Sequence, residues 1–321
     1  YEGQGLFQPD LGLWVGAVSF VAPPAPGVYR LLIEEFEYVA ANYIDGRIAT
    51  GTPITGVPTS TAAFVGGTGR GPVAEPTRVT SFADFERTFG GLSAGLTLGY
   101  AVRHFFDNGG RDAVIVRTAD PPVAAAIETA LAALEATAFN LLCVPPPADS
   151  DLPPSTRAAA AALCRRRRAL FIVDPGHAWT TAADAAKNLD TFFPQRGPES
   201  ALYFPFLHMA DPLANGQVRA FAPSGAVAGL MARTDMNRGV WKAPAGIEAS
   251  LNGMVAPAVA LNDRDNEGLN PLGINAVRRF PQAGVVVWGA RTLARTDRGE
   301  ADWKYVPVRA SVRAPQTTTP A

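Results

Sequence analysis

The residues whose types and spacing come nearest to catalytic chemistry are an aspartate, a histidine and a serine in the middle of the chain. Asp174 ends the apolar run "LFIVDP", and His177 follows three residues later. Sites in open α/β sheets gather at the carboxyl ends of strands, so this pair, with Ser224 as nucleophile, indicates an α/β hydrolase. However, the "PSG" around Ser224 lacks the G-x-S-x-G turn that exposes such a serine, and a serine that opens a helix is more often its N-cap. The hydrolase is therefore the weakest of the functional hypotheses.

The sequence gives even less support for a metal site or a phosphate site. The three histidines, His104, His177 and His208, are far apart, and the chain has no H-x-x-x-H or C-x-x-C spacing. His104 stands beside two phenylalanines on an expected helix, which is typical of a core histidine. "GGTGRGP" (66–72) has glycines and an arginine but no G-K-[ST], and its proline prevents the helix that a phosphate loop needs. We predict no metal and no cofactor, and we interpret this stretch as a turn.

Composition excludes further classes of partner. With 28 Lys and Arg against 29 Asp and Glu, the chain has no overall basic field to attract nucleic acid or anionic lipid. The run Arg165–Arg168 lacks interleaved aromatic residues and suits the end of a helix, or an acidic protein partner, better than nucleic acid. No apolar run is long enough to insert into a membrane. Cys143 and Cys164 are typical of small buried hydrophobes in a reducing compartment.

The elements that would position these residues alternate regularly from residue 61 onward. Buried strands are expected in the segments 61–67, 112–119, 139–145, 169–175, 201–209 and 283–293. Helices are expected in the segments 81–91, 96–110, 124–138, 155–168, 181–193 and 224–234. Ser81 stands at a cap position, and Thr181 with Asp184 has the spacing of a capping box. This alternation predicts an α/β fold: a three-layer core whose mainly parallel sheet is flanked by helices.

The ends of the chain differ from this core. Residues 1–60 are uneven and rich in glycine and proline, which predicts an extended N-terminal arm and linker. The core is expected to span residues 61–309. The low-complexity stretch 310–321 is expected to be disordered.

Three stretches combine glycine, proline, aromatic residues and cations at unusual density. They are "ITGVPTSTAAFVG" (54–66), "RGVWKAPAG" (238–246) and "VVWGARTLA" (286–294). Arginine and tryptophan are enriched at the energetic centres of protein interfaces, while glycine and proline fix the shape of a loop before it binds. This pattern indicates contact loops better than an active site.

Read together, these stretches resemble the contractile tail sheath family, the subunits that polymerise around the inner tube of contractile-tailed phages and related injection particles. The similarity extends roughly from Ala25 to Arg309. Its further motifs, in family order, are "APGVY", "RGPVAEPTRVTSFADFERTFGG", "LGYAVRHFFDNGG", "CRRRRALFIVDP", "YFPFL", "PSGAVAGLMARTDMNRGVWKAPAG", "LNPLGINAVRRFP" and "DWKYVPVR".

The resemblance implies a structural, non-enzymatic subunit that assembles helically around an inner tube and contracts to drive it through a target envelope. Its expected partners are neighbouring copies of the chain, the tube protein, and baseplate or terminator components. Its expected location is a virion tail or, for an injection particle, the bacterial cytoplasm before release. The subunit-contact candidates are Arg238, Trp241, Lys242, Trp288 and Arg291. The alternative for both tryptophans is a role as core anchors within their own subunit.

Two departures from the family pattern bear on this expectation. The segment Arg30–Pro53 stands where sheath subunits have a short link, and after "KYVPVR" the usual C-terminal region, which lies against the tube, does not follow. We therefore expect an incomplete tube-binding region. A truncated, sheath-like adaptor or capping subunit that does not polymerise stays open as the second hypothesis.

Overall fold

The computed structural model describes residues 6–8, 13–15, 60–119, 123–295 and 299–313. The chain divides into two compact units, Tyr1–Gly56 and Val57–Ala321. In the first unit, β1 (Leu6–Gln8) pairs antiparallel with β2 (Leu13–Val15). The rest of the predicted N-terminal arm lies outside the described residues. The domain boundaries expected from the sequence stay predictions.

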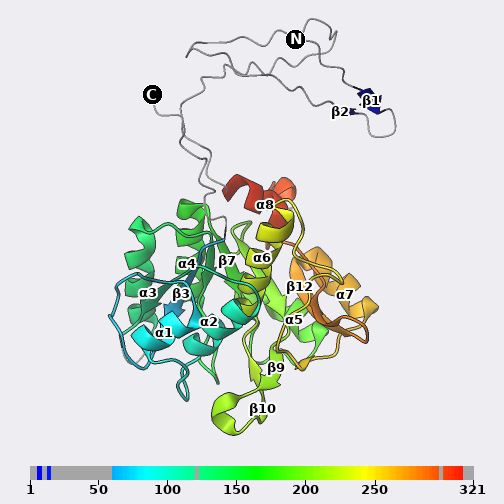
Figure 1. The fold of residues 1–321 in the computed structure, drawn as a ribbon. Helices are drawn as coiled ribbons and strands as arrows, with labels where there is room; N and C mark the ends of the chain where they lie inside the picture. The colour runs from blue at the N-terminus through cyan, green and yellow to red at the C-terminus, as the bar shows by residue number, and fades with distance from the viewer. Residues whose placement is uncertain (1–5, 9–12, 16–59, 120–122, 296–298, 314–321) are drawn as a thin grey trace, which may run out of the picture. The chain divides into compact units, whose positions relative to one another are not determined.

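The second unit is built on an eight-stranded sheet with the order β13-β12-β8-β7-β6-β3-β5-β4 (Figure 1). Its six inner strands run parallel, and the two edge strands, β13 and β4, are antiparallel to their neighbours. This confirms the mainly parallel α/β sheet. The strands are β3 (Ala62–Gly66), β4 (Thr77–Val79), β5 (Ala113–Arg117), β6 (Leu141–Cys143), β7 (Leu170–Val173), β8 (Ser200–Phe204), β12 (Ile274–Phe280) and β13 (Gly284–Val287).

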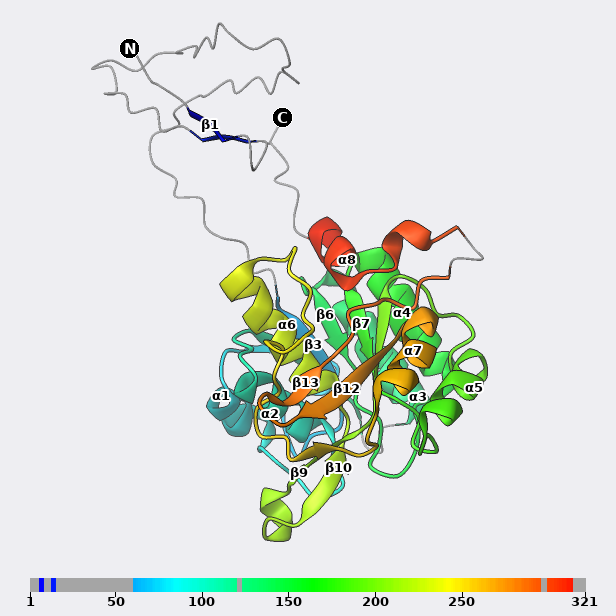
Figure 2. The ribbon, with the colours of Figure 1, turned by 90° about the vertical axis from the view of Figure 1, so that its right-hand side faces the viewer.

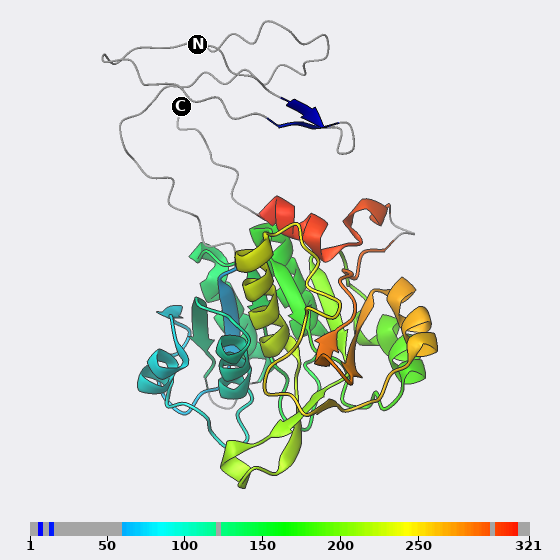
Figure 3. The ribbon, with the colours of Figure 1, turned by 45° about the vertical axis from the view of Figure 1, so that its right-hand side comes forward.

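Helices cover both faces of this sheet, which gives the three expected layers (Figure 3). The α-helices are α1 (Phe82–Phe89), α2 (Leu98–Asp107), α3 (Ala124–Ala133), α4 (Pro154–Arg167), α5 (Ala182–Phe192), α6 (Ser224–Arg238), α7 (Asp263–Leu269) and α8 (Val306–Arg313). Short 3-10 turns are η1 (Leu134–Ala136), η2 (Pro212–Ala214), η3 (Asn270–Leu272) and η5 (Ala301–Trp303).

Two hydrophobic cores lie on opposite faces of the sheet because successive side chains of a strand point to opposite sides. Phe64 and Ile115 belong to the core under α1, α2 and α6. Val65 and Val116, their neighbours in sequence, belong to the core under α3, α4, α5 and α7. Both faces of the central strands are therefore buried, which explains why these strands read as continuous apolar runs.

The helix starts follow the chemistry expected of them. The Ser81 side chain caps α1 by accepting the backbone N–H of Asp84. At α5, the side chains of Thr181 and Asp184 exchange hydrogen bonds with each other's backbone N–H groups, so the predicted capping box is confirmed.

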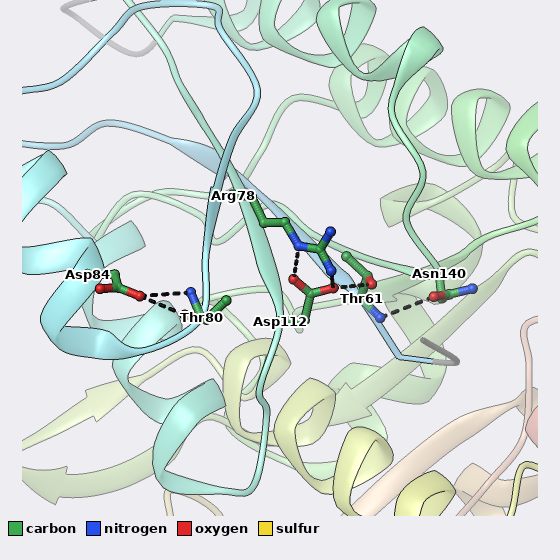
Figure 4. Close-up of polar contacts among 6 residues, drawn as sticks. All are labelled: Thr61, Arg78, Thr80, Asp84, Asp112 and Asn140. Carbon is green, nitrogen blue, oxygen red and sulfur yellow. Dashed lines mark hydrogen bonds and ion pairs between the residues drawn. The ribbon is translucent and has the colours of Figure 1, made fainter. Parts of the chain in front are cut away.

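A polar cluster fastens the amino end of β3 to the neighbouring strands (Figure 4). The Arg78 guanidinium makes two hydrogen bonds to the Asp112 carboxylate, and the Thr61 hydroxyl donates to the same carboxylate. On the other side, the Thr61 backbone N–H donates to the side-chain oxygen of Asn140 at 3.1 Å. The first residues of β3 are thus tied to β4, β5 and β6 at the amino edge of the sheet.

The prediction of one strand over residues 201–209 is wrong. β8 ends at Phe204, and after Pro205 the chain enters β9 (Leu207–Ala210), which belongs to a separate antiparallel sheet with the order β10-β9-β11. Proline has no N–H to continue the ladder, so the chain leaves the large sheet here. The partners are β10 (Val218–Phe221) and β11 (Ala256–Pro257).

Three helices differ clearly from the expected boundaries. α3 ends at Ala133, five residues before the expected end at Ala138, and the 3-10 turn η1 follows it. α6 continues to Arg238, four residues past the expected end at Thr234, and Gly239 ends it. α8 includes residues 310–313, which were expected to be part of a disordered tail.

Candidate subunit-contact surface

The contact candidates in the stretch 238–246 lie where α6 ends. Gly239 adopts a left-handed φ of 89°, and its N–H donates to the carbonyl oxygen of Asp235. A Cβ atom at this position would lie 2.7 Å from the indole nitrogen of Trp241. The backbone angle is what requires glycine here, because the exposed indole ring has room to turn away from an added Cβ.

A hollow of about 210 Å³ lies beside this turn. It is lined by Arg233, Thr234, Asn237, Arg238, Lys242, Ala243, Pro244, Ala245, Glu248 and Ala249. The Glu248 carboxylate lies 3.3 Å from Arg238 and 3.7 Å from Lys242. Such exposed pairs contribute less than about 1 kcal/mol each, so both cations are available to an incoming polar group at little cost.

Three exposed apolar side chains are sequence neighbours of residues that line the hollow. Trp241 is 68% exposed, Ile247 55% and Met236 46%. We call these three residues, together with Arg238, Lys242 and Glu248, the α6 corner. Large apolar side chains beside cations, on a loop shaped by glycine and proline, form a surface suited to a protein partner.

Trp288 and Arg291 lie in a different environment. The Trp288 ring is half-buried and packs against Phe280 with 4.6 Å between ring centroids. The backbone of Arg291 is held by the side chain of Asn275, and its guanidinium lies 5.3 Å from the ring centroid of Tyr305. The five candidates therefore do not form one cluster: three belong to the α6 corner, and these two make contacts within their own subunit.

The hydrolase hypothesis finds no triad in the structure. The Ser224 side chain is completely buried in the first turn of α6, and its backbone N–H donates to the Asp174 carboxylate at 2.8 Å. The His177 ring nitrogen pairs with Asp151 at 2.8 Å, whereas Asp174 accepts from the Ser224 backbone. Pro223, not Ser224, is the N-cap of α6, so Asp174 supplies the helix cap that we expected from the serine.

The other chemical candidates also have structural roles. His104 is buried, and this burial lowers the pKa of its imidazole to about 3, which keeps it neutral. Arg70 of the "GGTGRGP" stretch donates to the carbonyl oxygens of Glu86 and Arg87 in the last turn of α1, so this stretch closes a helix. Among the described residues, no group of three or more histidines, cysteines or acids could hold a metal ion.

The arginine run closes α4, as expected of a helix end. Arg165 pairs with Glu199 at 2.8 Å, and this carboxylate is only 1% exposed. Arg166 pairs with Glu135, and Arg167 donates to the carbonyl oxygen of Thr137. The first three arginines are thus engaged within the subunit. Both cysteines are buried, free thiols.

Comparisons with known proteins show which proteins share this architecture. The family model of the phage tail sheath protein central domain matches residues 121–293. The PVC sheath complex of an extracellular contractile injection system, solved in the contracted state, is 25% identical with a TM-score of 0.65, over 92% of this chain and 73% of that one. The helical sheath of the anti-feeding prophage, also contracted, is 26% identical with a TM-score of 0.61, over 87% and 74% of the two chains.

A more distant structure shares the fold. The sheath tail protein Lin1278 from Listeria innocua is 10% identical, with a TM-score of 0.60 over 79% of this chain and 74% of that one. A comparison with curated proteins finds no match. No helix in the described part of the chain has the length and apolar character to cross a membrane.

The layered sheet and the contracted sheath relatives define a class of protein: a structural subunit of a contractile sheath. More specifically, the chain belongs to the phage tail sheath protein family, whose central domain covers more than half of its length.

Proposed function

We propose that the chain is a load-bearing subunit without catalytic activity, which assembles helically around an inner tube, with baseplate and terminator components as further partners. The match to the central domain of the sheath family carries this proposal, together with the likeness to two contracted sheaths. Asp174 caps α6 and His177 pairs with Asp151, so neither is joined to Ser224 in a triad, which supports a mechanical function. The virion tail or an injection particle is the setting that this function requires.

We further propose that the α6 corner contacts a neighbouring subunit. A tryptophan that is 68% exposed contributes little to the stability of its own subunit. When a partner covers such a ring, it becomes the kind of buried aromatic anchor that dominates interface energies. The half-buried Trp288, packed on Phe280, is instead proposed to stabilise its own subunit. Arg291, beside Tyr305, is assigned the same role.

Replacing Trp241 therefore tests the contact. We expect Trp241→Ala to weaken assembly by about 2 kcal/mol or more per contact while leaving the free energy of unfolding of the subunit within about 0.5 kcal/mol. Sedimentation across a protein concentration series measures assembly, and urea unfolding of the dissociated subunit measures stability.

The matched control is Trp288→Ala. Removing this half-buried ring should lower the unfolding free energy by about 2 kcal/mol, because its packing against Phe280 is lost. If Trp241→Ala assembled at the wild-type concentration, the proposed role of the α6 corner would be rejected.

A further inference from the structure

Two strands of the β10-β9-β11 sheet and the turn between them form a lobe at the carboxyl edge of the large sheet. It begins at Leu207, three residues after β8 ends, and comprises β9, η2 and β10. In three views that differ only by rotation about the vertical axis, the lobe forms the lower end of the unit (Figures 1, 2 and 3). Two of its apolar side chains are exposed: Leu213 by 51% and Val218 by 56%.

The α6 corner lies at the amino edge of the sheet, where the parallel strands begin. α6 starts beside Asp174, which follows β7 at the carboxyl edge. Near its end, Asp235 accepts a hydrogen bond from the Ser60 hydroxyl, two residues before β3 begins at the amino edge. The fifteen residues of α6 span about 22 Å between these edges, so the lobe cannot reach the hollow of its own subunit.

The lobe is shaped in advance by one buried carboxylate. Asp211 accepts hydrogen bonds from the Tyr100 hydroxyl at 2.8 Å, the Arg219 guanidinium at 2.9 Å and the backbone N–H of Leu213 at 2.9 Å. Burial alone would raise the pKa of Asp211, but these bonds hold it below its usual value. A loop that is fixed in this way loses little conformational entropy when it docks.

The tip of the lobe is neutral, whereas the hollow presents two cations. The tip sequence "PLANGQV" (212–218) carries no charged side chain, so nothing on it repels Arg238 and Lys242. The side-chain amide oxygens of Asn215 and Gln217 can accept hydrogen bonds from these cations. The hollow of about 210 Å³ offers space for an apolar side chain of the size of leucine.

We propose that the lobe of one subunit docks on the α6 corner of a second copy of this chain, with Leu213 entering the hollow. The contact joins two different surfaces from opposite edges of the subunit. Such a head-to-tail contact is repeated from one copy to the next, and it builds a ring when its rotation closes and a helical polymer when it does not. The inference rests on the proposed helical assembly and adds which surfaces meet.

A pair of cysteines tests this juxtaposition. The full-length chain would carry Leu213→Cys together with Ala243→Cys, which lies on the wall of the hollow. Mild oxidation of assembled protein should give a ladder of disulfide-linked dimers, trimers and longer species on a non-reducing gel, because one chain donates a thiol at each end. The native Cys143 and Cys164 are buried and should not contribute.

The matched control combines Leu213→Cys with Gly268→Cys on α7, an exposed position on the opposite face of the sheet from α6. This pair should give no species longer than a dimer. Assembled particles without a ladder from the first pair, or with equal ladders from both pairs, would overturn the docking while leaving the proposed function intact. Failure of wild-type protein to assemble would overturn the proposed function and this inference with it.

A second variant gives an independent measure. Leu213→Lys places a positive charge on the tip, which Arg238 and Lys242 repel, and should raise the protein concentration needed for assembly by about tenfold or more. Leu213→Met, which keeps an apolar side chain of similar size, should assemble at the wild-type concentration. Equal assembly of the Lys and Met variants would contradict the docking of Leu213.

Discussion

A single methyl group added at Gly225 or Gly229 is expected to destabilise the subunit by about 3 kcal/mol or more. Both glycines lie where α6 crosses α2. A Cβ atom at position 225 would lie 2.2 Å from the carbonyl oxygen of Ala101, and one at position 229 would lie 2.3 Å from that of Phe105. These contacts are with backbone atoms, which cannot turn away as a flexible side chain would. The two helices can keep their present distance only if both positions are glycine.

Urea unfolding of Gly225→Ala and Gly229→Ala checks this expectation. Gly268→Ala is the control, because Gly268 also lies in a helix but has no atom within 4 Å of an added Cβ. There, alanine should leave stability unchanged or raise it by up to about 1 kcal/mol, as helix propensity predicts. Equal unfolding free energies for all three variants would contradict the close contact between α2 and α6 at these two glycines.

Asp174 is expected to make the stability of the subunit fall as the pH rises from about 4 to about 7. Burial raises the pKa of this carboxyl from 3.8 to about 7, and the hydrogen bond that it accepts from the Ser224 backbone N–H offsets only part of that shift. Between these two values the folded chain keeps a proton that the unfolded chain has released, so each increase in pH favours unfolding. The contribution is fully present below the unfolded pKa of 3.8 and is lost by pH 7. A shift of this size corresponds to about 4 kcal/mol.

Asp174→Asn removes the ionisation but retains an oxygen that can accept the Ser224 N–H. Its unfolding free energy should therefore depend on pH between 4 and 7 much less than that of the wild type. Asp184→Asn serves as a control of opposite sign, because hydrogen bonds from Thr181 and Thr180 lower the pKa of Asp184 and confine its effect to the acid range. Parallel wild-type and Asp174→Asn curves would contradict the raised pKa.

The α/β core could be predicted from the sequence because most of its strands and helices have local sequence signals. Apolar runs such as "LFIVDP" are buried on both faces, and caps such as Ser81 mark where helices begin. β12 was not predicted because "INAVRRF" includes residues that are usually exposed. Its Asn275 amide is satisfied by the carbonyl oxygens of Leu202 and Arg291, and Arg278 reaches Asp263. These partners come from distant segments, so the local sequence does not reveal them.

The candidate contact surface shows the same limit. The sequence placed Arg238, Trp241 and Lys242 on one loop, and the structure has them at one corner. The sequence could not show that Trp241 is exposed and Trp288 half-buried, because the two tryptophans have similar neighbours in the chain. What covers each ring depends on tertiary packing: Phe280 lies against Trp288, while Trp241 stands 68% exposed. The lobe was missed because its first strand read as a continuation of β8.

The central claim is that this chain is a subunit of a polymeric sheath, and electron microscopy of the purified protein, with and without an inner tube protein, tests it most directly. We predict stacked rings or helical tubes whose abundance rises with protein concentration and in the presence of the tube. Dispersed monomers under every condition would contradict the polymeric sheath and would favour a capping or adaptor subunit instead.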